Sequence, residues 1–386
     1  MQNIGFLNLP TWKERLQEIF VSLNRNDLLK LPLLGRENSD NAWSAFDKDE
    51  FFSLVQTGIL FECKTVKELP QRIITSDIFT AVSRLKAGLY RDTFFSAAIG
   101  STFPFLNIIT DTCSVSKPQT FFVQNDAFAG FVLSTMEAEG KPMSEAVCDA
   151  RWKGINIDNS SYSLHGIVSL NRLVLQIAEI FGCFAAPEKI PAAGINNLEL
   201  VDVVIGKELN MSIRLLGIAK YDDNLKAICE PCLIPERYFL AQARGGSEFL
   251  YVKTDDNQSQ IYGCPGTSPE TVVRGIVNDM SLVSMGSKPE LKVIEKVDEF
   301  ENRFYLRFTV TNLTDTLSEL LKQLTEADIE IEKIYQPQKL ESNSDEISIV
   351  LFTKKTKKTK LTIALDRISD LLKLASLKTV LRIIDR

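Results

Sequence analysis

The first residues that could do chemistry lie where a dinucleotide-binding fold carries its phosphate loop. Residues 4–9 (IGFLNL) form a short apolar strand with helical spacing behind it, the setting of a G-x-G-x-x-G fingerprint. The three glycine positions hold Asn8, Pro10 and Lys13. Those glycines permit a tight turn and close approach of the backbone to pyrophosphate, which these side chains oppose. The sequence therefore predicts a cofactor fold that has lost its cofactor-binding residues, and no bound cofactor is expected.

The thiols and the single histidine offer little further chemistry. Cys229 and Cys232 form C-E-P-C, but a structural zinc site needs four ligands and no second pair accompanies them. Pro231 between them favours extended backbone, whereas a redox dithiol requires a helix N-terminus. His165 is the only histidine and is interpreted as a surface or core residue. We expect no metal site.

Two segments could attract an anion. Residues 354–360 (KKTKKTK) place five lysines in seven positions between an expected strand and helix, and a solvated turn is the favoured interpretation. Residues 264–271 (CPGTSPET) lead into an expected helix whose first N–H groups would suit an anion. Plain turn chemistry explains that loop equally well, because Ser268 before Pro269 is a good helix start.

Composition and charge limit the possible classes. The chain has 386 residues, 45% of them hydrophobic and 24% charged, with a net charge of −6, so its length predicts two or three domains and its charge gives no support for nucleic-acid binding. The first twenty residues lack the features of a signal peptide, and no apolar run is long enough to span a membrane. Seven scattered cysteines fit reduced thiols. We expect a cytoplasmic protein without structural disulfides.

The elements that must position these residues fall into three regions. Residues 1–115 alternate strands and helices, which predicts a trimmed, degenerate Rossmann-like α/β domain with a parallel sheet. Residues 116–288 read as an α+β domain with a mostly antiparallel sheet and a long apolar helix at about 164–181. A charged stretch at 286–301 resembles a linker. Residues 302–386 follow a βαββαβ order, the ferredoxin-like arrangement.

The later segments resemble homoserine dehydrogenase with a C-terminal ACT domain. The resemblance rests on IRLLGIAKY, on CEPCLIPERYFLAQARGGSEFLYV with its loop ending at Ala241 and Glu248-Phe249 in an N-V-like slot, on QIYGCPGTSPET, and on the terminal βαββαβ unit. It covers nearly the whole chain. It implies a catalytic and dimerisation domain at 116–288, an ACT-like domain at 302–386, and hydride transfer between NAD(P) and homoserine or aspartate semialdehyde.

This chain departs from the family pattern at the expected cofactor loops. The T-A-N-K stretch reads Thr75, Ser76, Asp77 without a lysine, and G-G-G-I-P reads GSTFP at residues 100–104. The N-G-T-T-N-Y stretch reads DAFAGF at residues 126–131.

The expected catalytic helix departs further. We align this segment on Gly166. Ile157 then corresponds to the family's substrate-binding Glu, and Asn159 and Ser163 correspond to the two Asp residues that precede the glycine. Val168 corresponds to the catalytic Asp and Arg172 to the Lys. General acid–base catalysis needs a group that exchanges a proton near neutral pH, and an arginine stays charged there. Asp158 would restore one carboxylate only if the loop were shifted by one residue. No catalytic residue is therefore assigned.

Three hypotheses follow. The leading one is a pseudoenzyme of aspartate-family amino-acid metabolism with a binding or regulatory role, forming a homodimer or pairing with a related or pathway enzyme. The alternative is an active or repurposed oxidoreductase that uses NAD(P). The third is a sensor for an amino-acid effector, which is disfavoured because the D-x-P-G turn of ACT domains reads Asn312, Leu313, Thr314, Asp315, with a carboxylate at the glycine position.

Overall fold

The computed structural model describes residues 3–6, 58–61, 73–75, 78–95, 99–100, 105–106, 108–109, 116–155, 160–264, 288–310, 313–337, 347–371 and 375–384. The chain forms two compact units, each assembled from three stretches. Unit 1 comprises Met1–Gln119, Asn171–Pro187 and Tyr251–Glu295, and unit 2 comprises Thr120–Leu170, Glu188–Leu250 and Lys296–Arg386. The expected boundaries at 1–115, 116–288 and 302–386 remain a prediction.

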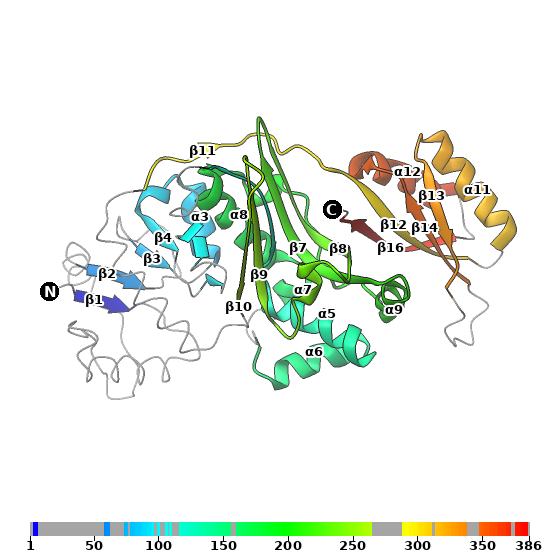
Figure 1. Cartoon of the computed structure of the whole chain (residues 1–386), viewed down its shortest axis with the longest axis horizontal. Helices are drawn as coiled ribbons and strands as arrows, with labels where there is room; N and C mark the ends of the chain where they lie inside the picture. Colours follow the sequence, from blue (N-terminus) through cyan, green and yellow to red (C-terminus); the bar gives the residue numbers. More distant parts are fainter. Residues whose placement is uncertain are drawn as a thin grey trace. The chain divides into compact units, whose positions relative to one another are not determined.

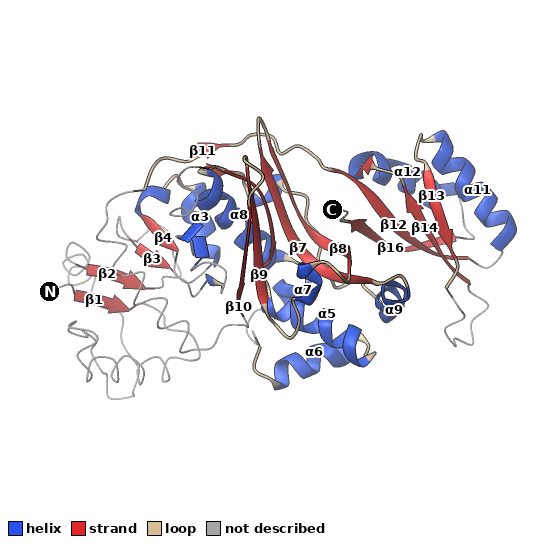
Figure 2. Cartoon of the chain, viewed as in Figure 1, coloured by secondary structure: helices blue, strands red, loops and turns tan. Residues whose placement is uncertain are grey.

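Unit 1 contains short parallel strand pairs, as its sequence predicted. β1 (Asn3–Phe6) pairs in parallel with β2 (Gly58–Phe61), and β3 (Ile73–Thr75) pairs in parallel with β4 (Thr93–Phe95). Helix α3 (Ile78–Lys86) and the 3-10 turn η2 (Tyr90–Asp92) connect the second pair. Figure 1 labels these four strands and α3, and Figure 2 colours helices and strands differently. The positions of Asn8, Pro10 and Lys13 lie outside the described residues.

The expected linker is not a free connection where the structure describes it. Within unit 1, β11 (Lys292–Val293) pairs in parallel with β6 (Cys183–Phe184). The Lys292 N–H donates to the Gly182 carbonyl at 3.1 Å, and the Ile294 N–H donates to the Phe184 carbonyl at 2.8 Å. These backbone bonds hold residues 292–294 against the chain that follows α8 (Ile167–Phe181). Strands β9 (Glu248–Thr254) and β10 (Ser259–Cys264) come before the expected linker in the chain.

Unit 2 is built on a sheet with the order β5-β7-β8-β16-β12-β14-β13. The antiparallel core comprises β5 (Pro118–Gln124), β7 (Met211–Tyr221) and β8 (Leu225–Pro235). The remaining strands are β16 (Ala375–Ile383), β12 (Glu301–Val310), β14 (Ile347–Thr353) and β13 (Ile331–Tyr335), with the two-residue β15 (Thr356–Lys357) paired to β12. The predicted mostly antiparallel sheet is confirmed.

Helices cover this sheet, and their ends follow local sequence rules. They are α5 (Ala127–Glu139), α6 (Met143–Trp152), α7 (Ser160–Leu164), α9 (Leu200–Glu208), α11 (Leu313–Glu326) and α12 (Lys358–Leu371), with 3-10 turns η5 (Pro187–Lys189) and η6 (Phe239–Gln242). The Asp126 carboxylate caps α5 by accepting from the Phe128 and Ala129 N–H groups, and Gly140 ends that helix with a φ of 64°. The expected helix at 164–181 is observed as α8 from Ile167 to Phe181, and Leu164 belongs instead to the short α7.

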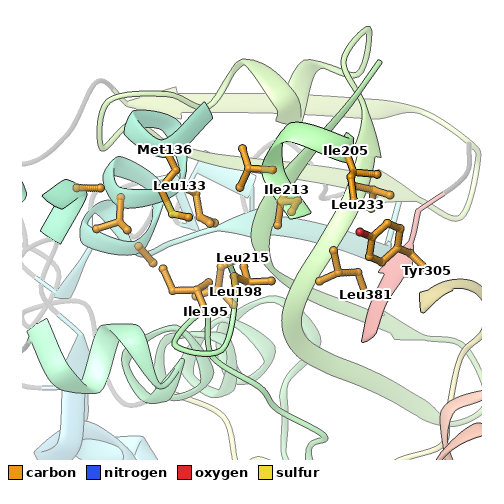
Figure 3. Close-up of a cluster of buried hydrophobic side chains, with 14 of the residues drawn as sticks. Leu133, Met136, Ile195, Leu198, Ile205, Ile213, Leu215, Leu233, Tyr305 and Leu381 are labelled. Atoms are coloured by element: carbon orange, nitrogen blue, oxygen red, sulfur yellow. The ribbon is translucent and has the colours of Figure 1, made fainter. Parts of the chain in front are cut away.

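The middle of β12, the first of the C-terminal strands, is buried on both faces. Side chains alternate along β12, so Phe304, Leu306 and Phe308 pack into a cluster with α11 and α12. On the opposite face, Tyr305 joins Leu381 in a second cluster with residues of α5, α9, β7 and β8, as Figure 3 shows. The strands of the βαββαβ unit therefore share this second hydrophobic cluster with the antiparallel strands β7 and β8.

The lysine-rich segment is held by carboxylates and is not simply a solvated turn. Lys354 pairs with Glu330 at 2.5 Å and Lys360 pairs with Asp328 at 2.5 Å. Lys358 reaches Glu230 on β8, which is only 2% exposed. The interpretation as a solvated turn fits Lys354, Lys355 and Lys357, which are exposed, whereas the tertiary structure gives Lys358 a buried acidic partner that the local pattern does not reveal.

Candidate functional site

Two glycines position the helix that would carry the catalytic groups. Gly166 has a φ of 74°, and a Cβ there would lie 2.8 Å from the Ala193 carbonyl oxygen. A Cβ on Gly194 would lie 2.1 Å from the Leu164 carbonyl oxygen. That oxygen accepts from the Ile195 N–H at 2.7 Å. Only glycine allows this close approach, which fixes the break before α8 and the direction in which α8 starts.

The resemblance assigns two positions on α8 to the family's catalytic Asp and Lys, and the structure describes the residues there, Val168 and Arg172. Val168 is 2% exposed and belongs to the hydrophobic core. Arg172 lies one helical turn later on the same face and is partly exposed. Ile157, Asp158 and Asn159 lie outside the described residues, so the structure does not test their placement.

A buried polar cluster that the sequence analysis did not select lies beside the start of α8. The Ser169 hydroxyl donates to Asn125 Oδ1 at 2.6 Å, and Asn125 Nδ2 donates to the Ser169 carbonyl at 3.3 Å. Cys229 on β8 contacts Ser169 and lies within electrostatic range of Asp126. Burial raises the pKa of the Cys229 thiol to about 12. A signal for the cluster was the Asn-Asp pair before an apolar helix, which is typical of a helix cap.

One oxygen of this cluster lacks a hydrogen-bond donor among the described residues. Asp126 Oδ1 accepts the two capping N–H bonds, whereas Oδ2 is buried without a partner. Asp126 is 2% exposed. One carboxylate oxygen, Oδ1, caps α5. The other, Oδ2, is buried and could accept a hydrogen bond from an additional donor.

A neighbouring pair of residues accounts for another departure from the family pattern. Gln124 Nε2 donates to the Ser247 carbonyl at 3.0 Å. A Cβ at Gly130 would lie 2.6 Å from that same nitrogen. Gly130 occupies the second asparagine position of N-G-T-T-N-Y, so the amide of Gln124 fills space that a side chain at residue 130 would need.

The C-E-P-C pair is a coincidence of strand sequence. Cys229 lies beside Ser169, whereas Cys232 packs in a hydrophobic cluster with Leu216 and Ile234. Residues three apart on a strand project from opposite faces, so these thiols do not meet. Burial raises the pKa of Cys232 well above its ordinary range.

Within the described residues, no group of three or more His, Cys, Asp or Glu side chains could hold a metal ion. His165 is exposed and bonds to the Ser161 carbonyl, as the sequence analysis expected of a lone histidine.

Neither Val168 nor Arg172, the described residues at the expected reacting end on α8, supplies the proton exchange that an NAD(P)-dependent dehydrogenase needs. Hydride transfer to or from a hydroxyl carbon requires a partner that takes or returns the hydroxyl proton. Val168 has no such group, and the guanidinium of Arg172 does not release a proton near neutral pH. We therefore derive no catalytic step through a nicotinamide cofactor. The phosphate-loop positions lie outside the described residues.

The fold defines the class of this protein: a parallel-stranded first region joined to a helix-covered, mostly antiparallel scaffold with a βαββαβ unit in the same sheet. Residues 104–281 match the family model described as homoserine dehydrogenase. Homoserine dehydrogenases of Helicobacter pylori and Bacillus subtilis are 24% and 20% identical to the chain, over 66% and 76% of its length. The chain is therefore similar to members of the homoserine dehydrogenase family.

Solved structures support the same fold. A homoserine dehydrogenase from Thiobacillus denitrificans superposes with a TM-score of 0.83 at 18% identity, covering 99% of this chain and 98% of that one. One from Staphylococcus aureus gives 0.69 at 16% identity, covering 100% and 99%. The matched region spans 62% of the Helicobacter relative and 70% of the Bacillus relative. In the described residues, no helix is both long and apolar enough to cross a membrane.

Proposed function

We propose that this chain is a homoserine dehydrogenase-like protein that does not carry out the dehydrogenase reaction and has a binding or regulatory role. One observation carries the proposal: Val168, at the family's catalytic Asp position, is an apolar core residue with 2% exposure. A carboxylate there would have to be buried, and an isolated buried charge is strongly unfavourable. The local packing therefore suits valine.

The polar cluster supports the same proposal. Asn125 and Ser169 satisfy each other, Asp126 caps α5, and the Cys229 thiol remains protonated at neutral pH. These groups stabilise the start of α8 and α5. The Asn125 amide and the Ser169 hydroxyl do not ionise at that pH, and the protonated Cys229 thiol is not available as a base.

Calorimetry and activity measurements test the proposal on the purified chain. We expect no heat of binding for NADPH or NADH and no homoserine-dependent reduction of NAD(P)+. The Helicobacter pylori homoserine dehydrogenase, measured in parallel, is the positive control. Tight dinucleotide binding together with homoserine oxidation would refute the proposal.

The second candidate is an active or repurposed NAD(P)-dependent oxidoreductase. The uncommitted Oδ2 of Asp126 favours it, because a buried carboxylate oxygen with no donor could accept a hydrogen bond from a substrate hydroxyl or ammonium. Asp126→Asn tests this role of Asp126 if wild type oxidises homoserine. If Asp126 contacts substrate, turnover falls while the fold persists; if it only caps α5, turnover per folded molecule stays unchanged.

The binding role requires a partner, which we propose to be a second copy of this chain or a related pathway enzyme. The chain keeps the fold of the family while the residues at the expected catalytic positions differ, and this combination supports a role in binding a partner. Two measurements distinguish a second copy of the chain from a related enzyme. Size measurement of the isolated chain detects a homodimer, and native co-purification with the chain as bait detects another protein. A monomer that retains no partner reproducibly would remove the proposal. An amino-acid effector is not proposed: Asn312 lies outside the described residues, and the side chains of 313–315 are not described.

A further inference from the structure

The ammonium of Lys288 is surrounded by aromatic rings in unit 1. Its Nζ lies 4.5 Å from the ring centroid of Phe95, 4.8 Å from that of Tyr90 and 5.2 Å from that of Phe94. A cation within about 6 Å of an aromatic centroid is attracted by the ring's quadrupole. All three rings come from η2 and β4, so one short stretch of chain supplies the aromatic part of this group.

A carboxylate from another element completes the surroundings. Glu179, near the end of α8, forms an ion pair with Lys288 and accepts a hydrogen bond from the Tyr90 hydroxyl. Burial, followed by the nearby charge of Glu179, raises the pKa of Tyr90 far above its ordinary range. The Tyr90 hydroxyl therefore stays a donor and holds the Glu179 carboxylate in place.

The site is shielded from water. The side chains of Lys288 and Glu179 are only 18% and 19% exposed, and Tyr90 and Phe94 are 6% and 8% exposed. Salt screens a partly buried pair less than an exposed one. Glu179 without a cation would be a shielded charge facing aromatic rings, so the site selects a positive group over an apolar one of similar size.

Lys288 is presented to the site by the chain itself. Its N–H donates to the Arg91 carbonyl at 3.3 Å, next to the aromatic stretch. Glu290 pairs with Arg91 at 3.6 Å, and β11 follows at Lys292–Val293. These contacts hold the backbone of Lys288 next to the aromatic residues, so its side chain can be regarded as a covalently attached ligand.

We propose that Tyr90, Phe94, Phe95 and Glu179 form a recognition site for a primary alkylammonium ion, and that Lys288 is its tethered ligand. When the lysine side chain is removed, a free alkylammonium occupies the same site. None of these residues is among the positions that the resemblance assigns to catalysis, and the proposal does not depend on whether the chain has dehydrogenase activity.

Chemical rescue of Lys288→Ala tests this site in the full chain. The substitution removes the atoms of n-propylammonium, so we expect a melting temperature lower by a few degrees. Titration with n-propylammonium chloride should restore that loss in a saturable way. n-Propanol and sodium chloride at matched concentrations should not restore it, because the site requires the positive charge.

Three variants serve as controls. Wild type and Lys288→Met, in which the site stays filled, should show no saturable response to n-propylammonium. Lys288→Ala combined with Glu179→Gln should lose the rescue, because the carboxylate is gone. Lys296→Ala removes a lysine that is 87% exposed and should leave the melting temperature unchanged.

The proposal is overturned if n-propylammonium stabilises wild type and Lys288→Ala equally, or if n-propanol rescues as well. Should Lys288→Ala not fold, Lys288→Met decides the question. It keeps the aliphatic stem without the charge and should melt below wild type. Equal melting temperatures for Lys288→Met and wild type would show that the positive charge is not recognised.

Discussion

At the scale of single residues, burial decides what each candidate group does. Val168 and Cys229 occupy positions that look functional in the sequence, one by resemblance and the other by its thiol. The structure places both in the interior, at 2% and 0% exposure. Burial removes Cys229 from nucleophilic chemistry and makes Val168 part of the packing that holds α8.

Val168→Asp tests the assignment of the catalytic position. The new carboxylate would be buried without a designed partner, so we expect the free energy of unfolding to fall by about 3–5 kcal/mol at neutral pH. Its pKa would be raised by burial, so the loss should be smaller in acid, where the carboxyl is protonated, and larger as pH rises. Denaturant unfolding across pH measures this. Val168→Asn, which is uncharged, should show no such pH dependence. A Val168→Asp variant as stable as wild type at neutral pH would contradict the buried position of Val168.

The thiols give a second prediction at this scale. The thiolate is the reactive form, and a pKa of about 12 leaves Cys229 protonated at about pH 8. Cys148 is exposed. We expect maleimide to label Cys148 and spare Cys229 in the folded protein, with both labelled after denaturation. Mass spectrometry of the labelled peptides checks this, and equal labelling rates in the folded protein would argue against the buried position of Cys229.

At the scale of elements, backbone contacts set the geometry of the candidate site. The turn between α7 and α8 packs against residues 193–195 so closely that neither Gly166 nor Gly194 can carry a Cβ. The direction of α8 therefore depends on a contact between segments almost thirty residues apart. The capping of α5 by Asp126 fixes a second helix beside it.

Gly194→Ala should destabilise the protein more than Gly140→Ala. At Gly140, which has a φ of 64° and no atom within 4 Å of a Cβ, the cost is the strained conformation, about 1–2 kcal/mol. At Gly194 the Cβ would overlap backbone, so main chain must move and the cost should exceed that of Gly140→Ala. Thermal unfolding of the two variants makes the comparison. Equal losses would mean that the turn relaxes freely.

At the scale of the whole molecule, the C-terminal strands of unit 2 are part of the scaffold. β16 pairs in parallel with β8, and Tyr305, Leu381 and Leu233 share one core. Two buried charge centres reinforce this junction. Arg382 and Lys358 meet Glu230, and Arg307 meets Asp202 at 2.6 Å. Asp202 also accepts from Tyr305 and Thr379.

Asp202→Ala measures how strongly the junction holds. Asp202 is fully buried, and its removal leaves the 1%-exposed Arg307 with the half-exposed Glu199 as its remaining acidic partner, so we expect a loss of about 3–5 kcal/mol in the free energy of unfolding. Asp149→Ala is the matched control: it breaks a partly exposed pair with Lys141 and should cost about 0–1 kcal/mol. Chemical denaturation reports both. A loss for Asp202→Ala no larger than for Asp149→Ala would show that the junction contributes little to stability.

The sequence by itself determined the order of elements, because hydrophobic periodicity and capping residues act locally. The alternation in RFYLRFTV, the Asp126 cap and the βαββαβ order all follow from neighbours in the chain. It also indicated that α8 lacks the family's carboxylate. Only the tertiary structure decided where the lysines of 354–360 find acidic partners, that Arg307 is buried rather than exposed, and that Lys288 enters an aromatic site. Each of these joins segments far apart in sequence, where the energy comes from desolvated charges meeting across space and no local pattern records the partner.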